Sequence, residues 1–270
     1  MSTRRVMFRQ SRVLERLRAG NPVSCLKVNL ADARVVELAA LCGFDCIWTD
    51  MEHIANNWQI VEHQILAAKV WDADVLVRVA RGSYSDYIRP LELDAAGIMV
   101  PHVMNLADAR NVVNMTRFQP LGRRPIDGGN ADAAYANIDL VEYAEQANDQ
   151  RFVCLQIEDP EVLADLEAIA ALPGFDMLFF GPGDFSHGLG ALGSWDDPRI
   201  VAARQRVAEV CADNGKFAGT VGTPASLADL MQMGYSFVSL GADVVGLSDY
   251  YKGILREAAR STEGLQEHSE

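Results

Sequence analysis

Lysine is scarce in this sequence, and basic residues are outnumbered by acidic ones. Of the 24 basic residues only four are lysines, namely Lys27, Lys69, Lys216 and Lys252. Few side chains could therefore form a Schiff base with a carbonyl substrate. The 37 acidic residues bring the net charge to −13. This balance disfavours a nucleic acid or an anionic membrane as partner, because the chain has no broad basic face to offer either one.

Long apolar runs and paired cysteine motifs are also missing. No apolar run approaches the roughly 20 residues of a membrane span, and the first residues lack the apolar region of a signal peptide. The five cysteines are odd in number and form no CxxC motif, which predicts reduced thiols rather than disulfides or a zinc site. We therefore expect a cytoplasmic protein. The first segment has the pattern of an amphipathic helix ending at Gly20.

What the sequence does contain is a regular alternation of short apolar runs with longer stretches of helical periodicity. Apolar residues make up 49% of the 270, enough for a large core, and we expect residues 1–270 to form a single domain. The expected strands cover residues 23–29, 45–50, 74–78, 97–101, 152–157, 177–181, 217–221 and 237–241. Eight strands alternating with helices predict a (β/α)8 TIM barrel, here with an extra N-terminal helix. An open doubly wound sheet is less favoured, because no expected strand leads directly into a GxGxxG loop.

Two acidic residues follow strongly apolar expected strands. Glu158 comes after strand 152–157 and Asp184 comes shortly after strand 177–181. Chemistry in a TIM barrel occurs at the carboxyl ends of the strands, so both side chains should meet at the barrel mouth. Two carboxylates there would repel each other unless they shared a cation, and oxygen ligands suit a hard divalent ion. Both residues could instead cap the helices that follow.

Three further features of the same strand ends are candidates for a functional site. Gly181-Pro182-Gly183 could bring backbone N–H groups close to an anion, or could form an ordinary tight turn. His53 could act as an acid or base oriented by Asp50, or could lie in a surface loop. Arg78 ends an apolar strand and could stabilise developing negative charge, or could simply pair with a carboxylate such as Glu52.

Taken together, these motifs resemble the HpcH/HpaI family of metal-dependent pyruvate aldolases, in the phosphoenolpyruvate/pyruvate barrel superfamily. The resemblance runs from about Val23 to Leu247. Its specificity lies in the combined order and spacing of the motifs rather than in any one of them. They are GFDCIWTDMEH (43–53), VRV (77–79), GIMVPHV (97–103), the stretch 120–124, LQIED (155–159), FFGPGDFS (179–186) and GYSFVSLGADVVGL (234–247).

The resemblance implies a role for each matching residue. Glu158 and Asp184 would hold a divalent metal (Mg²⁺, Mn²⁺ or Co²⁺), and Arg78 would stabilise the oxygen of the pyruvate enolate. His53, oriented by Asp50, would act as acid and base on the aldol hydroxyl. The residues implied in substrate binding are Gln156, Gly181, Pro182, Gly183 and Arg124.

The reaction implied is the reversible cleavage of a 4-hydroxy-2-oxo acid to pyruvate, or a close 2-oxo acid, and an aldehyde. The partners would therefore be small molecules, and the resemblance suggests a homo-oligomer, with a hexamer as the expected state. The sequence departs from the family pattern at residues 54–57, at Pro125, and at Lys27 and Asn29. These differences lie at the expected mouth or rim, where they would affect the choice of substrate.

Three other functions remain open from the sequence. The first is a Schiff-base aldolase that uses Lys27, the only lysine on an expected strand. The second is another carbon–carbon lyase of the same superfamily, acting on an acyl-CoA ester. The third is a catalytically inactive barrel that serves as a binding module.

Overall fold

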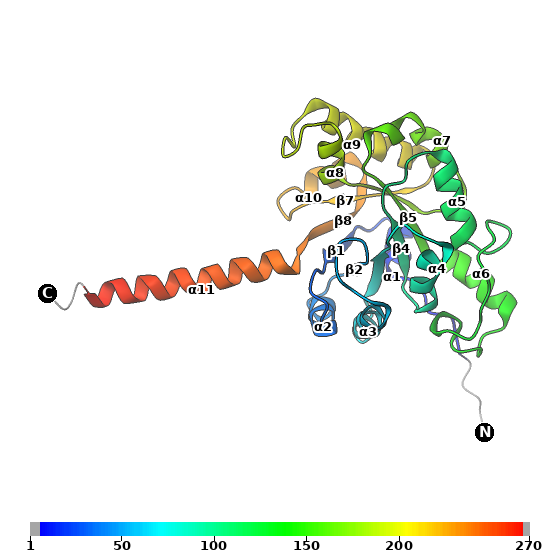
Figure 1. The fold of residues 1–270 in the computed structure, drawn as a ribbon, viewed down its shortest axis with the longest axis horizontal. Coiled ribbons are helices and arrows are strands. Elements are labelled where there is room, and N and C mark those ends of the chain that lie inside the picture. The colour runs from blue at the N-terminus through cyan, green and yellow to red at the C-terminus, as the bar shows by residue number, and fades with distance from the viewer. Residues whose placement is uncertain (1–5, 267–270) are drawn as a thin grey trace, which may run out of the picture.

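The eight expected strands form a closed parallel barrel (Figure 1). The computed structural model describes residues 6–266. Each strand pairs with its neighbour in sequence, and β8 closes the ring by pairing with β1. The strands are β1 (Val23–Lys27), β2 (Cys46–Asp50), β3 (Asp74–Arg78), β4 (Gly97–Val100), β5 (Phe152–Ile157), β6 (Met177–Phe180), β7 (Phe217–Val221) and β8 (Tyr235–Ala242). The predicted TIM barrel is confirmed.

Helices follow the strands around the outside of the barrel. They are α2 (Ala33–Leu41), α3 (Trp58–Lys69), α4 (Tyr84–Glu92), α5 (Leu106–Thr116), α6 (Leu140–Gln150), α7 (Leu166–Ala170), α8 (Pro182–Gly188), α9 (Pro198–Asp213) and α10 (Leu227–Met233). Two 3₁₀ turns are also present, η1 (Ala131–Ala133) and η2 (Pro160–Ala164). Residues 160–170 are therefore divided between the 3₁₀ turn η2 and the short helix α7. The break falls at Asp165, whose carboxylate accepts a bond of 2.8 Å from the N–H of Leu106 at the start of α5.

The N-terminal helix is shorter than the sequence suggests. Helix α1 spans Arg12–Arg18, and residues 6–11 before it are not helical. The helix begins here because the Ser11 hydroxyl accepts a hydrogen bond from the N–H of Leu14, as an N-cap does. Residues 1–5, also part of the expected helix, lie outside the described residues.

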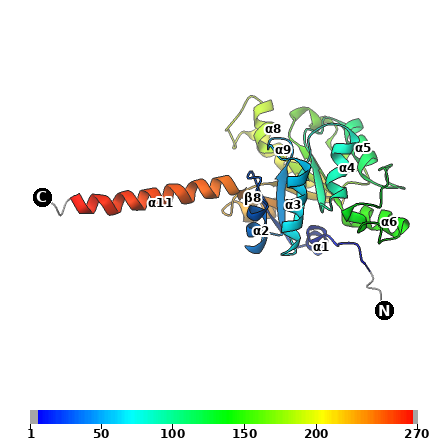
Figure 2. The same cartoon turned by 60° about the horizontal axis from the view of Figure 1, so that its bottom comes forward.

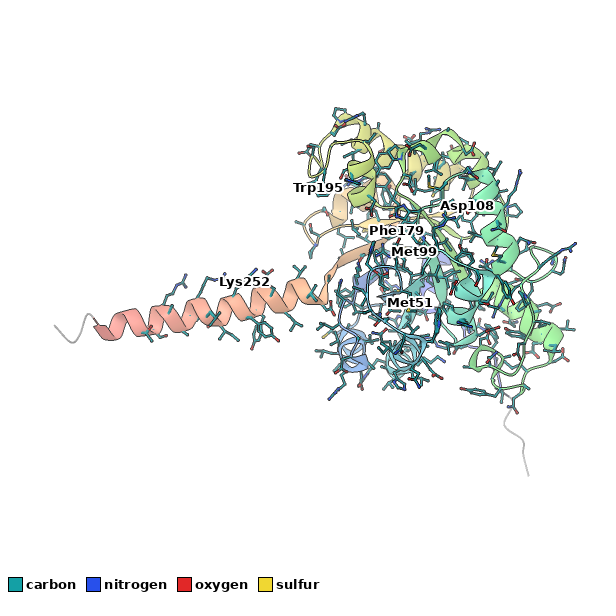
Figure 3. All side chains as sticks on the ribbon, in the orientation of Figure 1. Met51, Met99, Asp108, Phe179, Trp195 and Lys252 are labelled. Carbon is teal, nitrogen blue, oxygen red and sulfur yellow. The ribbon has the colours of Figure 1, made fainter. Side chains whose placement is uncertain are left out.

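The barrel interior is filled by apolar side chains that point inward from the strands. Phe179 lies at its centre, with ring centroids 5.5 Å from Trp48 and 6.3 Å from Phe237. Figure 3 shows Phe179 and Met99 within the barrel, where both are fully buried. Apolar residues of α1 belong to the same cluster and close it at one end. The interior is thus a packed core that forms a floor beneath the opposite, open end.

The last helix leaves the barrel. Helix α11 (Asp243–Gln266) projects away from the strands in both views (Figures 1 and 2), and Lys252 on it lies far from the barrel interior (Figure 3). Regular (β/α)8 barrels have a helix after each strand, forming an outer ring, so the outer face of β8 and β1 lacks its usual cover. Within residues 6–266, no helix is both long enough and apolar enough to cross a membrane.

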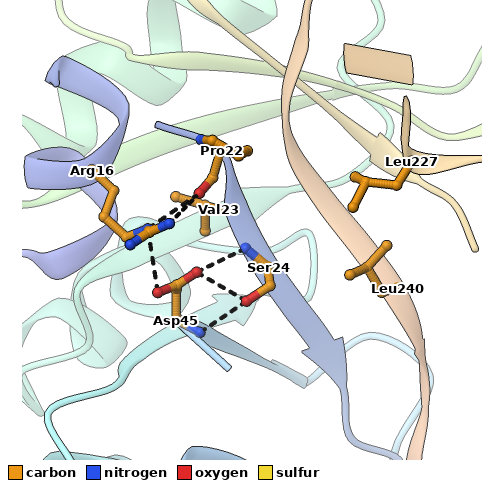
Figure 4. Close-up of a pocket in the computed structure, with 7 residues that line it drawn as sticks. All are labelled: Arg16, Pro22, Val23, Ser24, Asp45, Leu227 and Leu240. Carbon is orange, nitrogen blue, oxygen red and sulfur yellow. Dashed lines mark hydrogen bonds and ion pairs between the residues drawn. The ribbon is translucent and has the colours of Figure 1, made fainter. Parts of the chain in front are cut away.

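Two depressions mark this uncovered face. One, of about 300 Å³, is lined mainly by apolar residues of β1 and α2, such as Leu26, Val35 and Leu38. The other lies nearby, with Leu227 and Leu240 along one side (Figure 4). Its polar groups bond to one another, since Arg16 donates to the carbonyl of Pro22 and Ser24 donates to Asp45.

Candidate active site

The polar residues predicted from the strand ends meet at the open end of the barrel. Asp50 and Arg78 are the last residues of β2 and β3, and they are paired in register in the sheet. Gln156 lies on β5 and Glu158 directly follows it. All four are at least 95% buried, which is unusual for charged side chains unless they are paired or serve a site.

Asp50 and Arg78 form a buried ion pair at this mouth. The Nε of Arg78 donates to Oδ1 of Asp50 at 3.0 Å, and Nη2 donates to Oδ2. Arg78 also lies 3.1 Å from the carboxylate of Glu52. Burial acts to raise the pKa of Asp50, but the hydrogen bond and charge of Arg78 outweigh it, so the pKa lies below its usual value. Arg78 is thereby held as a fixed positive charge in a desolvated position.

The structure corrects the predicted role of Asp50. The imidazole of His53 does not contact the Asp50 carboxylate; its Nε2 lies 3.5 Å from Glu52, and the side chain is 58% exposed. The hydrogen bond between the two residues joins the backbone N–H of His53 to Asp50, at 3.5 Å. The reason is that Arg78 already occupies both oxygens of Asp50.

Glu158 is a buried carboxylate surrounded mainly by acidic and polar groups. One oxygen accepts a hydrogen bond of 2.8 Å from the backbone N–H of His102, and the other accepts one from Nε2 of Gln156. Burial raises its pKa to about 7, and the carboxylates of Glu52 and Asp184 add to this rise. Gly181 is required beside it, because a Cβ there would lie 2.8 Å from an oxygen of Glu158.

The donors at this point suit a divalent metal ion. Asp184 lies in the first turn of α8, exposed to solvent but close enough for its charge to act on Glu158. Gln156 has a buried amide oxygen without a hydrogen-bond partner among the described residues. Carboxylate and amide oxygens are ligands that hard cations prefer, and a cation would lower the raised pKa of Glu158 by favouring its charged form. Among the side chains that the structure describes, no cluster of three or more His, Cys, Asp or Glu is arranged for a metal.

His102 is a site residue whose importance the sequence did not reveal. Its Nδ1 lies 2.9 Å from Asp159 and 3.7 Å from Glu158, and its Nε2 lies 3.7 Å from Glu52. Burial lowers its pKa, but the three carboxylates outweigh burial and the pKa is raised overall. Its backbone φ of +49° is rare for a residue with a side chain and is often found at functional sites. The available signal was its position two residues after β4 ends.

The glycine segment predicted to bind the substrate carboxylate begins α8. Gly181 is the N-cap and Pro182 the first helical residue, while Gly183 is exposed with open space around its Cα. The hydroxyl of Ser186 donates to the carbonyl of Gly183 at 2.7 Å and steadies this turn. The segment therefore lies beside Glu158, on the side of the mouth formed by β5 and β6.

Arg124 does not lie at this mouth, which corrects its predicted role in substrate binding. Its guanidinium is buried between Asp132, at 2.9 Å, and the hydroxyl of Tyr143, at 3.1 Å. Its backbone bonds to Arg117, whose side chain contacts the carbonyl of Arg151 just before β5 begins. Arg124 thus belongs to the amino end of β5, whereas Glu158 follows the carboxyl end, six residues of strand away.

Known proteins resemble this chain in both sequence and fold. The HpcH/HpaI aldolase/citrate lyase family model matches residues 24–249. A hydroxypyruvate/pyruvate aldolase of Pseudomonas aeruginosa is 32% identical over 86% of this chain and 87% of its own length. A 4-hydroxy-2-oxo-heptane-1,7-dioate aldolase of Salmonella paratyphi B is 33% identical over 86% and 88%. The crystal structure of an HpcH/HpaI aldolase from Desulfitobacterium hafniense has a TM-score of 0.86 at 26% identity, covering 94% of this chain and 97% of its own.

Proposed function

The chain belongs to the HpcH/HpaI aldolase/citrate lyase family, and on that premise we propose which residues carry out its reaction. It is a carbon–carbon lyase of the aldolase type. The proposed reaction is reversible cleavage of a 4-hydroxy-2-oxo acid to pyruvate, or a close 2-oxo acid, and an aldehyde. The observation that supports it best is the buried Arg78 at the same mouth as Glu158, a buried carboxylate whose pKa is raised to about 7, chiefly by its burial.

In this proposal Glu158 and Asp184 hold the divalent ion, which would be Mg²⁺, Mn²⁺ or Co²⁺. When bound, such an ion acts as a Lewis acid that draws electrons from the 2-oxo group. The substrate carboxylate lies against the backbone of Gly181, Pro182 and Gly183. Gln156, whose buried amide oxygen lacks a partner among the described residues, orients the same end of the substrate.

The protein residues then act on the two halves of the reaction. The C3–C4 bond breaks, its electron pair passes into the enolate, and the proton of the C4 hydroxyl is removed. Arg78, fixed by Asp50, stabilises the negative charge that develops on the 2-oxo oxygen. His53 takes the hydroxyl proton, a role compatible with its exposed ring at the mouth, next to Glu52.

A Schiff-base mechanism through Lys27 is less compatible with the contacts of that residue. Imine formation needs a neutral amine, usually in an apolar pocket. Lys27 instead forms an ion pair with Asp50, with Nζ 3.2 Å from Oδ2. No contact among the described residues specifically favours the acyl-CoA lyase or the inactive barrel.

The function is tested by assaying the purified protein with pyruvate and a panel of aldehydes in the presence of Mg²⁺ or Mn²⁺. We expect aldol product and exchange of the pyruvate C3 protons with D₂O, both lost on adding EDTA and restored by metal. Proton NMR follows both signals in one sample. Activity that survives EDTA together with borohydride trapping of pyruvate would support the Lys27 mechanism instead.

We also propose that the protein forms a homo-oligomer, with a hexamer as the expected state, through its last helix. Helix α11 exposes a set of large apolar side chains to solvent, namely Val244, Val245, Tyr250, Tyr251, Ile254 and Leu255. The uncovered outer face of β1 and β8, with α2 beside it, has depressions that are also lined by apolar side chains. Since apolar patches of this kind are unfavourable in water, α11 of one subunit covering this face on another would bury both.

This proposal predicts that apolar residues of α11 maintain the oligomer. Changing Ile254 and Leu255 together to Glu should reduce the molar mass, measured by light scattering during size exclusion, to that of a monomer or small species. Ser261→Glu, an exposed polar site on the same helix, is the control and should leave the mass unchanged. A monomeric wild-type protein, or a double variant of unchanged mass, would contradict it.

A cytoplasmic location completes the proposal. It is supported by the five cysteines, which are all free and of which only Cys42 is exposed. A disulfide found by mass mapping of the native protein would argue against it.

A further inference from the structure

Lys27 is the one lysine at the mouth of the barrel within residues 6–266. It is the last residue of β1, and its ammonium lies 3.2 Å from Asp50. Its side chain is 22% exposed, whereas that of Asp50 is fully buried. A cation on the inner side of a strand end, partly open to solvent, faces the space that a substrate enters.

Asp50 does not depend on Lys27 for its charge balance or its hydrogen bonds. Arg78 donates to both of its oxygens, and the backbone N–H of Glu52 donates to Oδ1 at 3.0 Å. An ammonium group carries three donors, and within residues 6–266 Asp50 is the only charged or hydrogen-bonding group in contact with Lys27. Lys27 therefore has donors to spare on its solvent side.

The position of the ammonium is fixed from below by Trp48. Nζ of Lys27 lies 5.1 Å from the centre of the indole ring, and the guanidinium carbon of Arg78 lies 4.9 Å from it. Cations over the face of a tryptophan are attracted by the ring electrons. The Asp50 carboxylate and the Trp48 ring thus hold the two cations, Lys27 and Arg78, side by side. The ammonium of Lys27 is therefore ordered before any ligand binds.

Lys27 lies across the mouth from Glu158 and Asp184, the two proposed metal ligands. In the closed ring of eight strands, β1 and β5 are four strands apart, so they stand opposite each other. Glu158 follows β5 and Asp184 follows β6, while Arg78 ends β3, between the two sides. A substrate whose 2-oxo acid end was bound near Glu158 and Asp184 would extend its other end over Arg78 toward Lys27.

We propose that Lys27 determines specificity by binding a carboxylate on the aldehyde half of the substrate, so that the enzyme prefers acidic aldehydes to neutral ones. The inference rests on the proposed function, because it takes the 2-oxo acid end to lie near Glu158 and Asp184. It adds a recognition site on β1, separate from the residues that carry the bond cleavage.

The test compares ω-oxo acids of two, four and five carbons with their methyl esters, which have the aldehyde without the negative charge. With pyruvate and Mn²⁺, wild-type protein should show a higher kcat/KM for at least one acid than for its ester. Lys27→Met, similar in length but neutral, should reduce the acid-to-ester ratio about 10- to 100-fold, as expected for one charge-assisted hydrogen bond. Lys27→Arg should keep most of the preference, because it retains the charge.

The matched control is Lys216→Met. Lys216 also places its ammonium over an aromatic ring, 4.3 Å from the centre of Phe175, but it lies before β7 at the other end of the barrel. Its loss should leave the acid-to-ester ratio unchanged. Equal loss for acid and ester in Lys27→Met would assign Lys27 a purely structural role and overturn the proposal.

A wild-type protein that does not distinguish acid from ester would also overturn it, even if no variant folds. Failure of the proposed function itself is recognised separately, because the wild type would then form no EDTA-sensitive aldol product with any aldehyde and would not exchange the C3 protons of pyruvate.

Discussion

Replacing Glu158 with Gln is expected to abolish turnover and at the same time to stabilise the metal-free protein above pH 7. The amide keeps the shape and the hydrogen-bonding oxygen but removes the negative charge that would bind a cation. Since Lewis-acid stabilisation contributes several kcal/mol to the transition state, kcat/KM should fall about 1,000-fold or more. The measurement is aldol cleavage at saturating Mn²⁺, with metal affinity followed by calorimetry.

The effect on stability follows from the raised pKa of Glu158. In the folded protein the Glu158 carboxyl has a pKa of about 7, whereas in the unfolded chain its pKa is near 4.5. Between these values the folded state binds more protons, so the free energy of unfolding decreases as pH rises. In EDTA, wild type should lose up to about 3 kcal/mol relative to Glu158→Gln between pH 5 and pH 8.

Urea unfolding of both proteins at the two pH values measures this difference. Added Mn²⁺ should restore stability to wild type at pH 8 and have little effect on the variant. Glu161→Gln, an exposed glutamate three residues along the chain, is the control and should resemble wild type in activity and in pH dependence. Parallel pH profiles for wild type and Glu158→Gln would show that the buried carboxylate is not the group in question.

Replacing Arg78 with Ala is expected to slow both enolate formation and aldol cleavage. Arg78 is the buried positive group proposed to meet the 2-oxo oxygen, and loss of one fixed donor of this kind lowers kcat by about 100- to 1,000-fold. Both the C3 proton exchange of pyruvate and the cleavage of a 4-hydroxy-2-oxo acid should decrease together, since both pass through the same enolate. His53→Ala, by contrast, should slow cleavage more than exchange, because His53 is proposed to act on the C4 hydroxyl alone.

The Arg78 variant also leaves Asp50 buried without its main partner. Removing one member of a buried ion pair destabilises a protein by about 3 to 5 kcal/mol, although the nearby Lys27 should lessen this loss. Arg78→Lys is therefore the second variant, since it keeps a positive charge without the two-pronged bond to Asp50. If folded Arg78→Ala exchanges the C3 protons of pyruvate at the wild-type rate, Arg78 has no role at the enolate, whereas partial activity in Arg78→Lys alone would show that the charge is what matters.

Much of the barrel was predictable because strand and helix patterns are local. Each of the eight strands was found within two residues of its expected position at either end, since a buried strand of a parallel barrel is a short apolar run wherever it occurs. The position of Asp50, Arg78 and Glu158 at strand ends also followed from the sequence, because parallel strands bring all their carboxyl ends to one side.

What the sequence by itself determined was therefore the barrel and the residues that reach its mouth. Only the tertiary structure decided which of them bind one another. In sequence, Asp50 could have paired with either His53 or Arg78. Because β2 pairs with β3 in register at Asp50 and Arg78, the Asp50 carboxylate binds Arg78. Arg124 shows the same limit, because a residue in a long loop takes its place from contacts with distant parts of the chain. Local periodicity fixes elements, whereas pairing among charged side chains depends on burial and on competition between partners brought together by folding.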